Sequence, residues 1–345
     1  MRKILKTLFI NCFVFLGTVI LLDLIFGNWF KNDNFGYSIR ELRNVNIPMS
    51  VKYDGQIYDY IFQRNNHGFI GKEIDPKNIQ VVFLGGSTGE EMFKPHEYSI
   101  VGLLNKKLKE DNIKLDIVNA SRGGKTTRGY VNDFTYWFSK INNFDPRIFI
   151  FYIGLNDSSL ILPDHFDEPI KDNFIEKTED YVKNNSFFYQ LKKKIEHKYF
   201  NELRKYYGLA RPNLYENVNY LDYKKAKEKF YDLKLNNKNQ NIINNFSKNL
   251  ENLKNKINKN KIYPIFITQI QYDGLNNHSL FLINEFLKKF CEINNYNIIK
   301  LDEMSYDLNE KDFYDKVHTT ITGSIKISNL IYPNLKKYLM NYSTN

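Results

Sequence analysis

The stretch Gln80-Val81-Val82-Phe83-Leu84-Gly85-Gly86-Ser87-Thr88-Gly89 decides the fold. Its first half is a short apolar run, which is typical of a strand buried in a parallel sheet. Its second half is a glycine-rich turn, and glycine permits the tight backbone that such a turn needs. The turn places Ser87 at the carboxyl edge of the strand, where α/β sheets bind ligands.

Four more apolar runs follow this strand, and helix-period segments separate them. The runs cover residues 115–118, 147–153, 262–268 and 297–301, and the helical segments are clearest at 99–109, 127–141, 242–257 and 280–293. Strands that alternate with helices predict a doubly wound parallel sheet. We therefore expect one α/β domain over residues 79–345.

Residues 158–240 interrupt this alternation between the third strand and its next helix. The interval is far longer than such a connection needs, so it is an insertion. It contains Lys192-Lys193-Lys194 and a Lys/Tyr-rich piece at 223–234. These charges are typical of solvated helix faces, and a helical cap over the site is the alternative.

Composition excludes several classes of protein. The chain has 345 residues, of which 42% are hydrophobic, and its two cysteines allow at most one bridge, so a disulfide scaffold is excluded. The net charge of +10 comes from scattered lysines without an arginine-rich block, so we predict no nucleic-acid partner. We predict no metal site, because these histidines lack partners at ligand spacing: His96, His165, His197 and His278. We also expect no cofactor.

The N-terminal segment, residues 1–30, decides the compartment. An apolar, uncharged run covers residues 7–22 and continues past Asp23 to Phe26, which reaches the about 20 residues that a spanning helix needs. Because Arg2, Lys3 and Lys6 precede the run, the positive-inside rule places the N-terminus in the cytoplasm and the rest of the chain outside. A cleaved signal peptide is the alternative, but no A-x-A-like site follows. We expect a single-pass anchor with Asp23 at its outer end.

Residues 31–78 are expected to form a polar stalk with some strand structure. Segments 51–53 and 56–62 flank Asp54-Gly55, which is a two-residue hairpin signal.

The distal end of the chain supplies a base for Ser87. Asp315-Lys316-Val317-His318 lies between the fifth strand and an apolar C-terminal helix. His318 would take the proton of Ser87, and Asp315 would hold the imidazole in the useful tautomer. The letters around Ser87 match G-x-S-x-G, the nucleophile elbow of α/β-hydrolases, but there the serine lies in mid-sheet and here it follows the first strand.

Two further turns lie at the carboxyl ends of the second and third strands. They are Asn119-Ala120-Ser121-Arg122-Gly123-Gly124 and Gly154-Leu155-Asn156-Asp157. A glycine there can present a backbone N–H, and an asparagine a side-chain N–H, to an oxygen that gains negative charge. Each could also be an ordinary turn, since Asn-Asp and Gly-Gly are turn formers.

In this order, the motifs resemble the SGNH family, also called GDSL-type esterases and lipases, in a membrane-anchored bacterial branch. The resemblance covers residues 80–341 and implies a flavodoxin-like, three-layer α/β/α sheet. It assigns Ser87 as nucleophile and first oxyanion donor, Gly124 and Asn156 as further donors, and Asp315 and His318 as the acid–base pair. Gly86 stands where the name-giving motif has aspartate, and the adjacent Gly123 makes the second donor uncertain by one position.

The resemblance implies a serine esterase (a carboxylic ester hydrolase), and the predicted topology of the anchor places it outside the cytoplasm, in the periplasm or at the cell surface. Resemblance and location together predict removal of a small acyl group, acetyl above all, from a carbohydrate of the envelope or a secreted glycan. A lipid ester is another substrate class. The alternatives are an O-acyltransferase that acts on an envelope polysaccharide and a glycan-binding or assembly protein without turnover.

Overall fold

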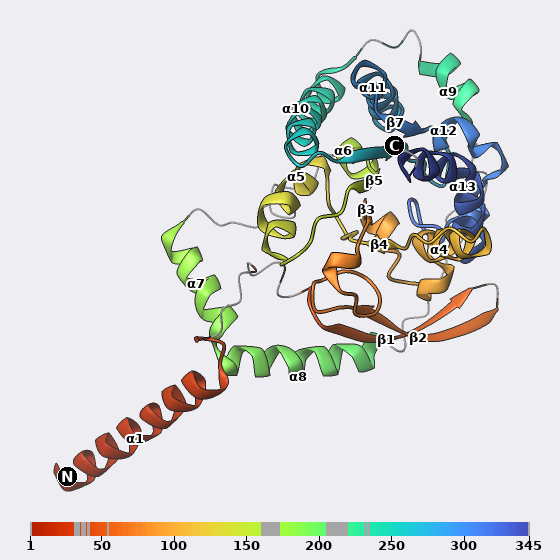
Figure 1. Ribbon diagram of the computed structural model, residues 1–345. Helices are drawn as coiled ribbons and strands as arrows, with labels where there is room; N and C mark the ends of the chain where they lie inside the picture. Colours follow the sequence, from red (N-terminus) through yellow and green to blue (C-terminus); the bar gives the residue numbers. More distant parts are fainter. Residues whose placement is uncertain are drawn as a thin grey trace.

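The computed structural model describes residues 2–30, 35, 39, 42–53, 55–159, 173–204, 220–230, 233 and 235–343. A five-stranded parallel sheet forms its centre, in the order β4-β3-β5-β6-β7 (Figure 1). The strands are β3 (Val81–Gly85), β4 (Ile117–Asn119), β5 (Ile148–Tyr152), β6 (Tyr263–Ile267) and β7 (Asn297–Ile299). Numbered within the sheet this order is 2-1-3-4-5, the flavodoxin-like order. The predicted doubly wound fold is confirmed.

Helices cover both faces of the sheet, and alternate strand residues point to each face. Val81 and Phe83 join the core under one layer, whereas Val82 and Leu84 join the core under the other. The first layer contains α4 (Ile100–Glu110) and α13 (Ile321–Ser343), and the second contains α5 (Thr127–Tyr136), α10 (Asn237–Lys259) and α11 (His278–Asn294). Short helices follow β3, β5 and β7: α3 (Ser87–Glu90), α6 (Leu155–Ser159) and α12 (Leu301–Met304). Because both faces are buried, the strands are continuous apolar runs.

An antiparallel hairpin of β1 (Val45–Tyr53) and β2 (Gln56–Arg64) precedes the sheet. Tyr53 pairs with Gln56, so two residues connect the strands, as predicted. Contrary to the polar stalk that the sequence suggested, this segment packs on the sheet domain. The apolar face of the hairpin buries Met49 and Val51 in one cluster with Tyr314 and Ile321, near the other end of the chain. Alternation along a strand shows that one face is buried, but it does not show what covers that face.

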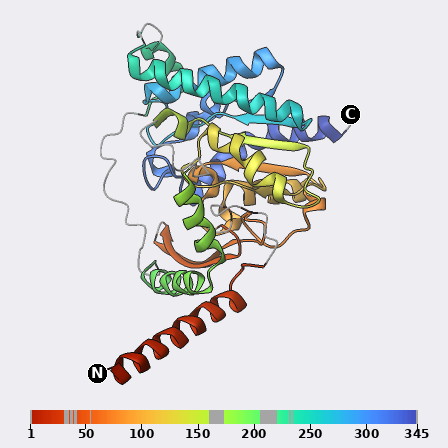
Figure 2. The same cartoon turned by 90° about the vertical axis from the view of Figure 1, so that its left-hand side faces the viewer.

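The N-terminal helix α1 (Arg2–Phe26) extends away from this body (Figures 1 and 2). It has 25 residues and no buried residue, and an 18-residue window within it has a mean hydropathy of 2.4, so it is long and apolar enough to cross a membrane. A signal sequence has the same properties. Asp23 lies in its last turn, and its carboxylate accepts hydrogen bonds from Trp29 Nε1 (3.0 Å) and Ser186 Oγ (2.9 Å).

The described parts of the insertion lie at two separate places. Helices α7 (Phe174–Asn185) and α8 (Phe187–Arg204) lie at the end of α1, and α8 also contacts β1 (Figure 1). Helix α9 (Tyr223–Phe230) packs on α12, and Leu221 forms a bridge with Gly274 beyond β6. Neither α7 nor α8 therefore caps the carboxyl edge of the sheet, whereas the segment before α9 reaches the loop that follows β6.

Candidate active site

Ser87 begins the short helix α3 directly after β3. Its flanking glycines are required by packing, since a Cβ on Gly89 would lie 2.7 Å from Ser121 Oγ and 2.9 Å from the ring of Phe83. A Cβ on Gly85 would lie 3.1 Å from the same Ser121 oxygen. The G-x-S-x-G spacing thus lets the turn fold tightly over β3 while Ser87 itself stays half-buried. Ser121 is fully buried, so it is no rival nucleophile.

The surroundings of Gly86 explain why a glycine stands where the name-giving motif has aspartate. The amide of Asn156 occupies the space beside Gly86, and a Cβ on this glycine would collide with Asn156 Nδ2. The same Nδ2 donates to the carbonyl oxygen of Lys125 (2.7 Å). Because an amide NH₂ has two hydrogens, one remains for a ligand beside the Ser87 turn. The structure therefore brings Asn156 and the Ser87 turn together, as the sequence predicted.

The turn after β4 runs alongside the turn of Ser87. Arg122 N donates to Gly85 O (3.0 Å), and a Cβ on Gly123 would lie 3.8 Å from the Cβ of Ser87. The N–H of Gly123 donates to Glu90 Oε2 (2.8 Å), so this donor is already used. Gly124 follows in the left-handed region with φ of +75°, which favours glycine.

A buried arginine from the hairpin holds this turn. Arg64 Nη2 donates to Glu90 Oε1 (2.6 Å) and to Ser121 O (2.8 Å), and Nη1 donates to Gly68 O (2.8 Å). Its side chain is only 1% exposed. Arg64 thereby joins β2, α3 and the turn that precedes Gly124. No sequence pattern predicted this role, since Glu90 and Ser121 lie 26 and 57 residues from Arg64 along the chain.

Asp315 and His318 form a hydrogen-bonded pair in the loop before α13. Asp315 Oδ2 lies 2.6 Å from His318 Nδ1, and Asp315 Oδ1 accepts the N–H of Val317 (2.8 Å) and of His318 (2.7 Å). Burial alone would raise the pKa of Asp315, but the hydrogen bond and charge of His318, together with these N–H groups, outweigh it and lower the pKa. The ring of Tyr314 stacks on that of His318 at 5.5 Å. The Asp315 carboxylate is thus ionised and oriented on Nδ1 of His318, which leaves Nε2 as the second ring nitrogen.

A buried ion pair connects the loop of His318 to the helix of Ser87. Glu91 and Lys94 lie 2.7 Å apart, and their side chains are 2% and 1% exposed. Lys94 Nζ also donates to Thr319 O and Ser324 Oγ, both at 2.6 Å, and Glu91 Oε1 accepts from Ser324 Oγ at 2.6 Å. Because the charged groups of Glu91 and Lys94 both have hydrogen-bond partners, this buried network fixes the loop that carries His318 against the segment that follows α3.

Two further polar residues join the turns. Gln269 Nε2 donates to Thr88 Oγ1 (2.8 Å), and Gln269 Oε1 accepts the N–H of Leu155 (2.7 Å). Asp157 accepts from the N–H and the hydroxyl of Thr127, both at 3.1 Å. Asp157 thus orients the Asn156 turn, as expected. Gln269 was missed, although its place just beyond the fourth strand of the sheet was the signal that could have found it.

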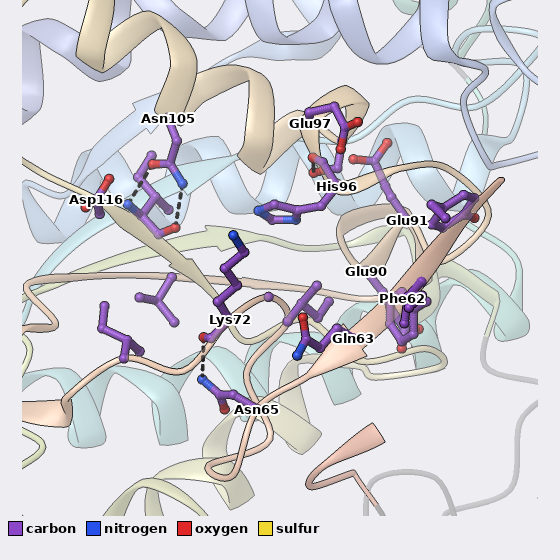
Figure 3. Close-up of a pocket in the computed structure, with 18 of the residues that line it drawn as sticks. Phe62, Gln63, Asn65, Lys72, Glu90, Glu91, His96, Glu97, Asn105 and Asp116 are labelled. Carbon is purple, nitrogen blue, oxygen red and sulfur yellow. Dashed lines mark hydrogen bonds between the residues drawn. The ribbon is translucent and has the colours of Figure 1, made fainter. Parts of the chain in front are cut away.

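A cavity of about 570 Å³ lies behind this site, between β2, the start of β4 and the segment after α3 (Figure 3). Glu90 and Glu91 lie on its wall, together with Lys72, His96 and Asp116. Ser87, Asn156 and His318 do not line it. None of the candidate catalytic groups therefore lies on the wall of this cavity.

A flavodoxin-like sheet that carries a serine after its first strand and a bonded Asp–His pair before its last helix defines a class of serine hydrolases. The family model described as GDSL-like Lipase/Acylhydrolase matches residues 81–331. The chain belongs to this family, so the resemblance is confirmed over residues 81–331 and the protein is a GDSL-type ester hydrolase. A search of curated protein sequences finds no match.

Three solved structures of similar shape match this chain with the following TM-scores, sequence identities and covered shares of each chain. The structure of TesA has a TM-score of 0.45 and 10% identity and covers 75% of this chain and 99% of its own. The structure of the acetyl xylan esterase AlAXEase has a TM-score of 0.43 and 15% identity, and the match covers 74% of this chain and 98% of its own. The structure of the psychrotrophic esterase EstA from Pseudoalteromonas sp. has a TM-score of 0.42 and 12% identity, and the match covers 75% of this chain and 98% of its own.

Proposed function

We propose that this protein is a membrane-anchored serine esterase that removes a small acyl group, acetyl above all, from a carbohydrate hydroxyl outside the cytoplasm. The observation that carries the proposal is the bond of 2.6 Å between Asp315 and His318, on a loop that Glu91 ties to the helix of Ser87. Family membership supports the ester chemistry. The apolar helix α1, with Arg2, Lys3 and Lys6 before or within its first turns, supports the location.

In this mechanism, His318 Nε2 accepts the proton of Ser87 Oγ while the oxygen attacks the ester carbonyl. The N–H groups of Ser87 and Gly124 and the amide of Asn156 stabilise the oxyanion. Gly124 is favoured over Gly123, because Glu90 already binds the N–H of Gly123. The sugar hydroxyl leaves with the proton from His318, and a water molecule, deprotonated by His318, then releases the acyl group as a carboxylic acid.

Ser87→Ala tests the nucleophile. In the purified full chain, a fluorophosphonate probe should label the parent and Ser121→Ala but not Ser87→Ala, because Ser121 is buried. Turnover of acetylated sugars should be lost only in Ser87→Ala, and both variants should keep a cooperative thermal transition. Labelling that persists in Ser87→Ala would refute the assignment.

An acetylated-sugar panel distinguishes the hydrolase from its alternatives. Free acetate in the presence of an unacetylated acceptor sugar indicates hydrolysis, and acetylated acceptor indicates an O-acyltransferase that uses the same acyl-enzyme. Sugar binding without either product would indicate a glycan-binding protein and contradict the proposal.

A further inference from the structure

Helices α7 and α8 expose apolar side chains in stripes. On α8, Phe188, Leu191 and Ile195 follow one another at helical spacing and are 38%, 41% and 49% exposed. On α7, the exposed apolar residues are Phe174, Ile175, Tyr181 and Val182. Single exposed apolar residues are ordinary, but seven of them on two helices that pack against each other indicate an interaction surface.

The turn between these helices is fastened to the end of α1. Asp23 Oδ1 accepts from Ser186 Oγ and from Phe188 N (3.3 Å), which caps the start of α8. Asn28 N donates to Asn185 O (2.8 Å), and Gly27 is packed so closely that a Cβ would collide with this same carbonyl oxygen. The position of both stripes is thus fixed relative to α1.

Aromatic contacts complete this junction. Phe26 packs on Phe187 with ring centroids 5.5 Å apart, and Trp29 packs edge-on against Tyr181 at 5.8 Å. Trp and Tyr are enriched where a spanning helix leaves the bilayer. The chain therefore reaches α7 and α8 at the depth where headgroups would surround the end of α1.

The two helices run across the direction of α1. Figure 2 shows α1 along its length and α8 nearly end-on, and in Figure 1 α7 rises from the junction whereas α1 descends from it to the lower left. Exposed lysines accompany the apolar stripe of α8: Lys192, which pairs with Glu196 at 3.7 Å, and Lys194. Apolar residues beside lysines on a helix that lies across a spanning helix are typical of an interfacial helix on anionic lipid.

We infer that α7 and α8 form a lipid-contacting platform that lies in the headgroup region of the bilayer and holds the hydrolase domain at a fixed orientation on the membrane. The inference rests on the anchor proposed above. Its partner is the outer surface of the same bilayer that α1 crosses, and its anionic headgroups bind the lysines of α8. Because α8 also contacts β1, the platform holds the hairpin, and through it the sheet domain, in place relative to the membrane.

The test uses the full chain in vesicles of phosphatidylcholine, with or without phosphatidylglycerol. In a background of Cys12→Ser and Cys291→Ala, an environment-sensitive fluorophore is attached to one cysteine at a time: Leu191→Cys or Ile195→Cys on the platform, Phe15→Cys within α1, and Ile293→Cys as the matched control. Ile293 is 69% exposed at the end of α11, remote from α1. Thermal melting verifies that each labelled variant is folded.

We expect shallow spin-labelled lipids to quench positions 191 and 195 and to leave position 293 unquenched, while deep spin labels quench position 15. Phosphatidylglycerol should strengthen the quenching at 195, and Lys192→Gln/Lys194→Gln should remove that increase. Quenching at position 15 without quenching at positions 191 and 195 overturns the platform but not the anchor. Self-quenching at position 191 that rises with protein concentration and does not depend on lipid also overturns the platform, because it would indicate that a second copy of the chain covers this surface. No quenching at 15 overturns the anchor itself.

Discussion

The Nδ2 of Asn156 has two neighbours in the structure. It donates one hydrogen bond to Lys125 O, and it lies so close to Gly86 that a Cβ there would collide with it. If Asn156 donates to the oxyanion, Asn156→Ala should lower kcat by roughly 10²- to 10³-fold with little change in KM. If it only shapes the turn, the variant should lose about 1 kcal/mol of stability and keep its kcat. Kinetics and thermal melting of one preparation separate the two outcomes.

Gly86→Ala is the companion to this variant, since its methyl group would displace the amide without removing it. It should lower kcat in the same direction, and the double variant should lose little beyond Asn156→Ala because both changes act on one donor. A parental kcat in Gly86→Ala would contradict this use of the glycine.

Asp315 gives the site a pH dependence that can be measured as stability. Its pKa is lowered in the folded protein, so its ionised form stabilises the fold above the unfolded carboxyl pKa of about 3.9, and this contribution disappears as the pH falls through the lowered value. The melting temperature of the parent should exceed that of Asp315→Asn at neutral pH, and the difference should shrink below about pH 4. A constant difference down to low pH would show that the charge is not responsible.

At the scale of elements, the hairpin supports the site through Arg64. Arg64→Met would leave the partly buried Glu90 without its cation, so we expect a loss of about 3 kcal/mol in the free energy of unfolding. It should also lower kcat, because Glu90 and Ser121 no longer hold the turn that precedes Gly124. Lys256→Met, which removes only an exposed bond to Thr135, is the control and should change stability by less than about 0.5 kcal/mol. Equal denaturation curves for the two variants would contradict this role.

The elements that sequence predicts well here are those whose signal is local. Each parallel strand is an apolar run because both of its faces are buried, and the predicted hairpin forms because its turn is encoded by adjacent residues. The catalytic candidates were found because each follows a strand or precedes a helix. Arg64, Lys94 and Gln269 were missed because their partners come from other parts of the chain, and burial of a polar side chain is visible only after folding.

At the scale of the whole molecule, the predicted topology places the hydrolase domain outside the cytoplasm. Arg2, Lys3 and Lys6 should retain the N-terminus inside, so a C-terminal reporter that is active only outside should work. Replacement of the three cations by glutamine should reduce its activity, and replacement of Lys336 and Lys337 near the C-terminus should not. Activity of a cytoplasmic reporter at the same position would overturn the topology and, with it, the proposed substrate class.

The hairpin also determines how the chain must mature. Its apolar face is covered by Tyr314 and Ile321. The two strands are synthesised early, so their apolar face stays uncovered until these late residues have been synthesised. Contacts between segments so distant in sequence form slowly and leave apolar surface open to aggregation in the meantime. A nascent chain that stalls before residue 314 would therefore lack Asp315 and His318, and it would expose the apolar face of its hairpin to chaperones and proteases. The segment that is made last thus both covers the apolar face of the hairpin and supplies His318.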